Sequence, residues 1–392
     1  MADAPPAYLD HAASTPLRPE ARDAMVDVLD RSFANPSGAH AAARAARQLV
    51  DESREIVAEA VGARPGEVVF TSGGTEADNL AVTGVAAARP GPVLCSAVEH
   101  PAVAEPARHA GGGPVPVDRL GRVDLDALEA MLEPAAGGPG VALVSVMAAN
   151  NEVGTVQPLD AVAEAVRRLQ PAAALHTDAV QAVPWLDVAV VAAGFDLVSL
   201  SAHKFGGPKG VGALVVRGGL PLTPLLRGGG QERARRSGTE NVVGIVGLAA
   251  ALSATVAERA DTVRRVAAQR DRLADGLVAA VPGLVETGVA RRADGGADRR
   301  HKVAGACHVC IDGIESESLL FLLEEAGVHA SAASACASGA VEPSPVLAAM
   351  GVPRSAARGA LRLSLGATTT DADVDRALAA VPAAVDRLRR FS

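Results

Sequence analysis

The sequence contains few cysteines, few lysines and almost no aromatic residues. Among its 392 residues there are four cysteines, and aromatic side chains make up 2%. So few cysteines in so long a chain exclude a disulfide-stabilised scaffold. The scarcity of aromatic residues leaves Ala, Val and Leu to build the core. The net charge of −8 gives no reason to expect a nucleic acid or an anionic membrane as a partner.

Long apolar runs are absent as well. No uninterrupted run approaches the roughly 18 residues of a membrane-spanning helix. The first ten residues, MADAPPAYLD, lack the basic and apolar regions of a signal peptide. We therefore expect a cytoplasmic protein with no membrane partner. The 49% hydrophobic and 21% charged residues are typical of a globular chain, and the length indicates two or three domains.

The four cysteines lie in different settings. Cys95 falls in an apolar run and is expected in a core strand, whereas Cys307 and Cys310 form a single CxxC. One such pair is weak evidence for zinc, so we expect strand residues there and predict no metal site. Cys336 lies in ASAASACASG, among small side chains only. It is either a small apolar filler or a reactive thiol on a segment that can move.

Lysine is rarer still, with only Lys204, Lys209 and Lys302 in the chain. Arginine supplies every other basic side chain, so a retained lysine is a candidate for chemistry that arginine cannot perform. A neutral lysine amine can form a covalent bond to a carbonyl carbon, and arginine cannot. Lys302 lies in an Arg-rich stretch that we predict to be a solvated loop, within a mobile segment at 285–305.

Residues 65–217 alternate short β-branched runs with helical patterns. This alternation predicts a mostly parallel sheet with helices on both faces. The expected strands are GEVVFT, GPVLCSAV, VALVSVM, AALHTD, FDLVSLS and GALVVR, and the last pair should be antiparallel. A helix is expected at about 245–281. Beyond it, a strand–helix–strand pattern and a strand–turn–helix pattern predict a smaller α/β domain. We assign 15–257 to the large domain and 1–14 with 258–392 to the small one.

Polar residues follow five of these expected strands directly. They are Thr71 to Thr75, His100, Asn150 with Asn151, Asp178 with Gln181, and Ser201 with His203 and Lys204. Open α/β sheets bind ligands at the carboxyl ends of their strands, so these clusters should converge on one crevice.

Three of the clusters suit a single cofactor. In FTSGGTEADNLAV, a strand, two glycines and a threonine precede a helix, which would form a cradle for an anion. Lys204 follows an apolar strand, where burial favours its reactive amine. Asp178 could keep a pyridine nitrogen protonated. Each feature has an ordinary alternative, namely a capped turn, a surface lysine and a helix N-cap, but together they predict pyridoxal phosphate.

With these residues in view, the chain resembles the cysteine desulfurases of the class V aminotransferase group, which are fold-type I pyridoxal phosphate enzymes. The matching segments are YLDHAASTP, ANPSGAH, VVFTSGGTEADNLAV, VEHPAV, NNEVGTVQP, HTDAVQ, SLSAHKFGGPKGVGAL, GGGQERARRSGTEN, SACASGAVEPS and LRLSLG. The Cys-bearing loop, at about 329–342, is of the family's longer type. The resemblance implies an α/β fold with a mostly parallel seven-stranded sheet between helices, plus a smaller α/β domain.

The resemblance also implies a role for each candidate residue. Lys204 would bind the cofactor covalently and later move the substrate α-proton, with His100 stacked on the ring and assisting. The other cofactor ligands would be Asp178 at the pyridine nitrogen, Gln181 at the phenolic oxygen, Gly74, Thr75, Ser201 and His203 at the phosphate, and Thr239 from a second subunit. Asn151 and Arg362 would bind the substrate carboxylate, and Cys336 would attack the substrate sulfur.

The implied function is removal of sulfur from L-cysteine, giving L-alanine and a persulfide on Cys336. A homodimer would then pass this sulfur to an acceptor protein, such as an iron–sulfur scaffold, a tRNA- or DNA-thiolating enzyme or a sulfur carrier. Two alternatives remain open. One is another fold-type I enzyme, such as a selenocysteine lyase or an aminotransferase, and the other is a non-catalytic sulfur-relay subunit.

Overall fold

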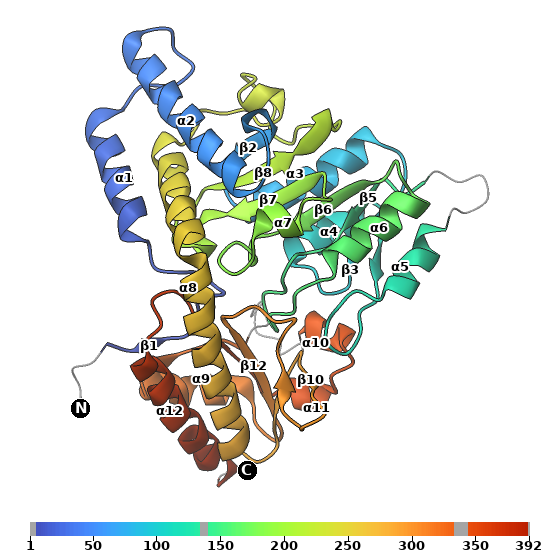
Figure 1. Ribbon diagram of the computed structural model, residues 1–392, viewed down its shortest axis with the longest axis vertical. Helices are drawn as coiled ribbons and strands as arrows, with labels where there is room; N and C mark the ends of the chain where they lie inside the picture. Colours follow the sequence, from blue (N-terminus) through green and yellow to red (C-terminus); the bar gives the residue numbers. More distant parts are fainter. Residues whose placement is uncertain (1–4, 134–139, 333–343, 391–392) are drawn as a thin grey trace.

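A seven-stranded sheet forms the centre of the large domain (Figure 1). The structure is a computed structural model that describes residues 5–133, 140–332 and 344–390, so Cys336 lies outside the described residues. The strand order is β2-β8-β7-β6-β5-β3-β4. The strands are β2 (Val68–Thr71), β3 (Val93–Ser96), β4 (Gly113–Val115), β5 (Leu143–Ser145), β6 (Ala174–Asp178), β7 (Leu197–Ser201) and β8 (Gly212–Val216).

Strand directions in this sheet follow the sequence pattern. Strand β8 pairs antiparallel with both β2 and β7, and the remaining pairs are parallel. The predicted antiparallel pair is therefore confirmed. Strand β4 was not among the six expected strands, because its three residues include a glycine and a proline. A proline is tolerated there because β4 is an edge strand.

Helices cover both faces of the sheet, as the alternating pattern predicts. One face is packed by α3 (Gly74–Ala88) and α4 (Pro101–His109). The other face is packed by α2 (Ala41–Ala60), α5 (Leu125–Leu132), α6 (Leu159–Leu169) and α7 (Val188–Val191). Because both faces are covered, the central strands are continuous buried runs.

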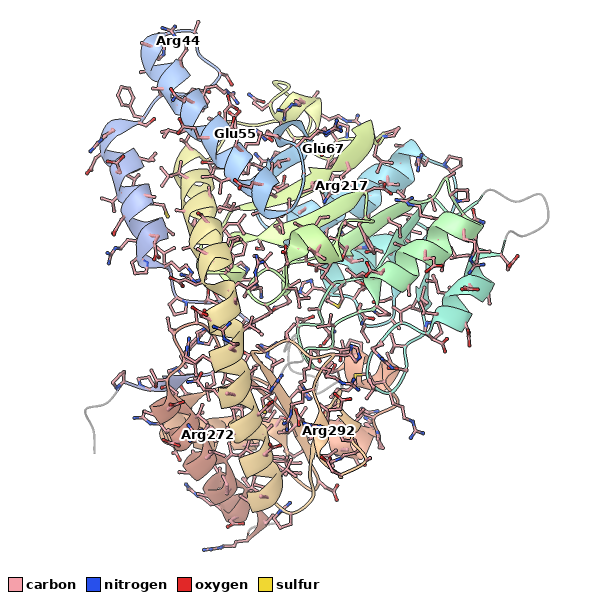
Figure 2. The ribbon with its side chains drawn as sticks, in the orientation of Figure 1. Arg44, Glu55, Glu67, Arg217, Arg272 and Arg292 are labelled. Carbon is pink, nitrogen blue, oxygen red and sulfur yellow. The ribbon has the colours of Figure 1, made fainter. Side chains whose placement is uncertain are left out.

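Helix α8 (Val242–Ala280) runs from the sheet into the smaller domain (Figure 1). Its first half packs against α1 (Pro19–Arg31) and α2, and its second half packs against α12 (Asp371–Arg389). Figure 2 shows Arg272 on the lower half of α8, where it pairs with Asp375 of α12. By length and composition α8 could cross a membrane, but half of its most apolar window is buried in the fold. The domain boundary expected at 257 and 258 falls inside this shared helix.

The smaller domain is built on a three-stranded antiparallel sheet. Strand β12 (Ala306–Ile311) lies between β9 (Leu284–Glu286) and β14 (Ala360–Ser364). Strand β13 (Val328–His329) pairs with β1 (Ala7–Tyr8), and the helices of this domain are α9 (Ser316–Glu325), α10 (Pro345–Ala349), α11 (Arg354–Ala357) and α12. Cys307 and Cys310 lie buried on β12, as Cys95 does on β3. Among the described residues no group of three or more acidic, histidine or cysteine side chains could hold a metal.

The prediction that 285–305 is a mobile loop with a solvated Lys302 is wrong. The segment forms the end of β9 and a hairpin of β10 (Ala290–Arg291) and β11 (Ala297–Asp298). The Lys302 side chain is fully buried, and its Nζ donates to the Thr287 carbonyl at 2.8 Å. Glu286 lies 3.5 Å from this Nζ and also pairs with Arg299 at 2.7 Å. The side chains of Lys302 and Arg299 are therefore buried against Glu286, whereas Arg291, Arg292 and Arg300 of the same stretch are exposed.

This pairing makes a stability prediction. Replacing Glu286 with glutamine would leave Lys302 without an acidic partner in the described structure, and Arg299 with only the more exposed Asp271 and Asp275. Removing one partner of a buried ion pair costs about 3–5 kcal/mol, so Glu286→Gln should lower the free energy of unfolding by about this amount in guanidinium denaturation. The control is Glu325→Gln, since Glu325 pairs with Arg387 on the exposed surface. Equal midpoints for the two variants would contradict the prediction.

Candidate active site

The turn between β2 and α3 forms an open cradle. Gly73 has a φ of 152°, a conformation that favours glycine, and Gly74 begins the 15-residue helix α3. The first amide N–H groups of a helix have no partner within that helix, and they favour an anion. The cavity here has a volume of about 340 Å³, and its lining includes Ser72, Gly73, Gly74, Thr75, Ser201 and His203. We call it the anion cradle. Four of these residues, Gly74, Thr75, Ser201 and His203, are the ones predicted to hold a phosphate.

Gly74 leaves little space for a side chain. A Cβ at this position would lie 2.9 Å from Cγ2 of Val180 and 3.3 Å from Cβ of Ser201. We expect Gly74→Ala to push Ser201 away from the cradle and weaken cofactor binding by about tenfold, which corresponds to about 1.4 kcal/mol. The measurement is the dissociation constant of pyridoxal phosphate by absorbance titration. Gly66→Ala is the control, because nothing lies within 4 Å of the added Cβ. Unchanged affinity in Gly74→Ala would contradict the prediction.

Lys204 ends the short 3-10 helix η2 (Ala202–Lys204), which follows β7 directly. Its Nζ donates to the carbonyl oxygens of Ala12 and Ala13, at 2.5 and 2.9 Å. Burial, then the charge of Arg362, lowers the Lys204 pKa to about 8, while the charge of Asp178 opposes the shift. A substantial fraction of this amine is therefore neutral near physiological pH, as nucleophilic attack on a carbonyl requires.

Asp178 and His100 lie within electrostatic range of Lys204. One oxygen of Asp178, at the end of β6, accepts a hydrogen bond from the Val180 amide at 2.8 Å. Burial raises the Asp178 pKa to about 6, against the opposing charge of Lys204. His100 caps α4, and its Nδ1 accepts from the Ala102 amide. Its ring reaches solvent, yet partial desolvation and the Lys204 charge lower its pKa, so the imidazole is neutral and suited to stacking.

Sequence reasoning missed a buried polar network beside Asp178. His176 lies between the hydroxyls of Ser145 and Ser199, at 2.8 and 3.0 Å. Oδ1 of Asp78 on α3 is 3.7 Å from Nε2 of His176 and has no hydrogen bond in the described structure. Burial, then the charge of Asp178, raises the Asp78 pKa. The available signal was polar residues at positions of α3 and β6 that are otherwise apolar.

A second cavity, of about 230 Å³, lies where the two domains meet, and its lining includes Lys204, Gln181, Asn151 and Arg362. We call it the main cavity. Arg362 on β14 is almost fully buried, and it donates to Asp10 at 2.7 Å and to the Asn151 carbonyl at 2.9 Å. Its Nε has no partner in the described structure. An arginine held in place by two such contacts at the wall of a cavity suits a carboxylate ligand.

Residues 12–14 lie between the two cavities, with Ala12 lining the main cavity and Ala13 and Ser14 lining the anion cradle. The Ala12 carbonyl accepts from both Lys204 and Gln181, the latter at 2.8 Å. Neither Asp10 nor Ala12 was a predicted site residue, although both fall in the motif YLDHAASTP. Thr239 lies on an exposed loop before α8 and lines neither cavity, and Cys336 lies outside the described residues.

The comparison with known proteins agrees with this geometry. A family model described as aminotransferase class-V matches residues 7–377. The chain belongs to the aminotransferase class-V family. It is 43% identical over 396 residues to the IscS-like cysteine desulfurase of Mycobacterium tuberculosis, with 98% of this chain and 97% of that protein covered. The expected family is thereby confirmed.

Two solved structures of similar proteins have the same fold. One, described as a NifS-like protein, has a TM-score of 0.88 and 33% identity, covering 97% of this chain and all of that one. Another, described as SspA in complex with cysteine, has a TM-score of 0.77 and 30% identity, covering 93% and 99%. The predicted α/β fold with its mostly parallel sheet is confirmed.

The class-V family depends on pyridoxal phosphate, and the residues present here fit that group. The anion cradle suits the phosphate, since Gly74 leaves it open where a Cβ would fill it. Asp178 is a buried acid, as the pyridine nitrogen requires, and Lys204 offers an amine of lowered pKa for the aldehyde. The three groups lie at the carboxyl ends of β2, β6 and β7, where open α/β sheets bind their ligands.

Proposed function

We propose that this chain is a pyridoxal phosphate-dependent cysteine desulfurase. It would convert L-cysteine to L-alanine and take the sulfur onto Cys336. The observation that carries the proposal is the main cavity, which is lined by both Lys204, a lysine of lowered pKa, and Arg362. That pairing suits an α-amino acid, whose carboxylate would bind Arg362 while its α-proton lies near Lys204.

Each residue of the chain has a distinct task in the proposed reaction. Asn151 and Arg362 bind and orient the substrate carboxylate, and Lys204 removes the α-proton and later returns a proton. Gln181 and Asp178 hold the cofactor's phenolic oxygen and pyridine nitrogen, and the anion cradle holds its phosphate. The bound cofactor withdraws electrons from the substrate and so weakens its Cβ–S bond. His100 covers the ring face and assists proton movement.

The sulfur step is a displacement at sulfur. The Cys336 thiolate attacks the substrate sulfur, and an S–S bond forms while the Cβ–S bond breaks. The electron pair of the broken bond stays with the carbon skeleton, which takes up a proton and leaves as alanine. The sum is L-cysteine plus a Cys336 thiol giving L-alanine plus a Cys336 persulfide, with no external oxidant. An acceptor thiol or a reductant then removes the outer sulfur.

We further propose a homodimer and a separate sulfur-acceptor protein. Thr239 is exposed on a single chain, as a residue that serves a second subunit would be. Apolar Val26 and Leu29 of α1 and the following Phe33 are exposed by 49%, 65% and 95%, which favours a protein interface on this side. A cytoplasmic location agrees with the free thiols of Cys95, Cys307 and Cys310.

The test is product analysis with the purified, cofactor-loaded protein. With L-cysteine and a reducing thiol we expect equal amounts of alanine and sulfide. Pyruvate and ammonia in place of alanine would contradict the proposal, and so would transfer of the amino group to a keto acid. A relay subunit without its own chemistry would form no alanine at all. Names of relatives such as IscS-like cysteine desulfurase favour the desulfurase over both alternatives.

A further inference from the structure

The chain segment that contains Cys336 is attached at both ends to the substrate-binding residues. On the N-terminal side, Ser331 and Arg362 form a two-way backbone pair, with N–O distances of 2.7 and 3.1 Å. On the C-terminal side, the Ser344 hydroxyl donates to Oε2 of Glu152 at 2.5 Å. Glu152 directly follows Asn151. One attachment is therefore to Arg362 itself and the other to the neighbour of Asn151, the two residues proposed to hold the substrate carboxylate.

The Glu152–Ser344 hydrogen bond is buried, and the other contacts of the Ser344 hydroxyl fix its direction. Glu152 and Ser344 are 6% and 3% exposed. The Ser344 oxygen also accepts from the amides of Val346 and Leu347, at 3.1 and 3.2 Å, so it caps α10. Its single hydroxyl proton is thus left for Glu152. Because a buried hydrogen bond to a carboxylate is strong, this contact holds the start of α10 in place.

The turn that carries Glu152 is itself rigid. Oδ1 of Asn150 accepts from the amides of Glu152 and Val153, both at 2.9 Å. Nδ2 of Asn150 donates to the Val98 carbonyl, two residues before His100. Arg362 donates to the Asn151 carbonyl at 2.9 Å. One turn therefore contacts Arg362, the segment just before His100, and, through Glu152, Ser344.

An apolar cluster also lies between α10 and the large domain. Val98, Met147 and Val153 of the large domain pack against Val346, Leu347 and Met350 around α10. This cluster would hold α10 near the turn without any carboxylate. A buried glutamate is costly to desolvate, and at such a place it indicates a demand for orientation beyond simple packing.

We infer that Glu152, through Ser344, is a positioning residue for sulfur transfer. It would fix the C-terminal end of the Cys336 segment relative to the bound substrate, while the Ser331–Arg362 pair fixes the other end. This inference rests on the proposed desulfurase function. It assigns Glu152 to the step in which Cys336 attacks the substrate sulfur, and not to the step in which the α-proton is removed.

Two measurements on the cofactor-loaded protein separate these halves. The first is alanine and sulfide formation from L-cysteine, which needs Cys336. The second is exchange of the α-proton of L-alanine with deuterium from solvent, which needs Lys204 and Arg362 but no thiol. We expect Ser344→Ala and Glu152→Ala to slow the first by about tenfold to a hundredfold, the scale of a misplacement of about 1 Å. The exchange rate should stay within about twofold of the parent.

Three further variants sharpen the test. Glu152→Gln keeps an oxygen that can accept from Ser344, so it should retain most of the desulfurase rate. The double variant Glu152→Ala with Ser344→Ala should be no slower than the worse single variant, since each change removes the same Glu152–Ser344 hydrogen bond. Thr370→Ala removes the N-cap of α12 in the same domain and should leave both rates unchanged.

The inference is overturned if Glu152→Ala and Ser344→Ala slow both reactions equally, which would mean a general structural role. It is also overturned if neither variant slows sulfur formation. Failure of the proposed function would be recognised separately, because the parent protein itself would then form no alanine from cysteine.

Discussion

Replacing Lys204 with alanine is expected to abolish alanine formation from L-cysteine, with a fall of at least about a thousandfold, because one side chain serves as cofactor anchor and as proton carrier. No other lysine can substitute. Lys302 is buried in the smaller domain against Glu286, and Lys209 lines the anion cradle but not the main cavity. The measurement is the initial rate of alanine release together with the absorbance of the bound cofactor.

The matched variant for this prediction is Lys204→Arg. It keeps a positive charge in the cavity but cannot supply a neutral amine, since arginine stays protonated. If charge alone mattered, Lys204→Arg would retain activity. We expect it to be as inactive as Lys204→Ala, while thermal unfolding of the apo-protein changes little in both. Substantial activity in either variant would remove Lys204 from its proposed role.

The second large effect is expected for Cys336→Ser. Serine keeps the size and polarity of the side chain but cannot accept sulfur, so sulfide formation from L-cysteine should fall by at least about a hundredfold, in line with loss of a covalent nucleophile. The α-proton exchange of L-alanine should continue at the parent rate, since no thiol takes part in it. This division distinguishes Cys336→Ser from Lys204→Ala, which should lose both reactions.

The other cysteines provide the control. Cys95 and Cys307 are buried, and burial raises the pKa of each thiol to about 12, so neither forms a thiolate near neutral pH. Cys95→Ser and Cys307→Ser should therefore retain the sulfide rate. Loss of sulfide formation in these variants but not in Cys336→Ser would transfer the proposed role to another thiol.

Much of the fold was predictable because its signals are local. The β-branched runs that became β2, β3, β5, β6, β7 and β8 each lie within a few residues of sequence. Strand β4 was missed because three residues on a sheet edge carry almost no pattern. The stretch at 285–305 was misjudged for a different reason. Nothing in the sequence indicates that Lys302 and Arg299 are buried beside Glu286 of β9, because that contact depends on tertiary packing.

The site divides in the same way. Gly74, Asp178 and Lys204 were predicted because residue type, strand position and motif all indicated their chemistry, and Arg362 was predicted from the family resemblance. The side chains that hold these residues in position could not be predicted from the sequence. Asp10 reaches Arg362 across 352 residues of sequence, and Ser344 reaches Glu152 across 192. Pairings at such distances leave no periodicity or spacing in the chain, so only the folded structure reveals them.

The most direct test of the account is to locate the sulfur after one turnover. The cofactor-loaded protein is mixed with less than one equivalent of L-cysteine in the absence of reductant. The masses of its peptides are then measured by mass spectrometry. We predict that the peptide with Cys336 gains the mass of one sulfur atom for each alanine formed, and that a reductant reverses the gain. Alanine formed without this gain, or with the gain on Cys95, Cys307 or Cys310, would contradict the account.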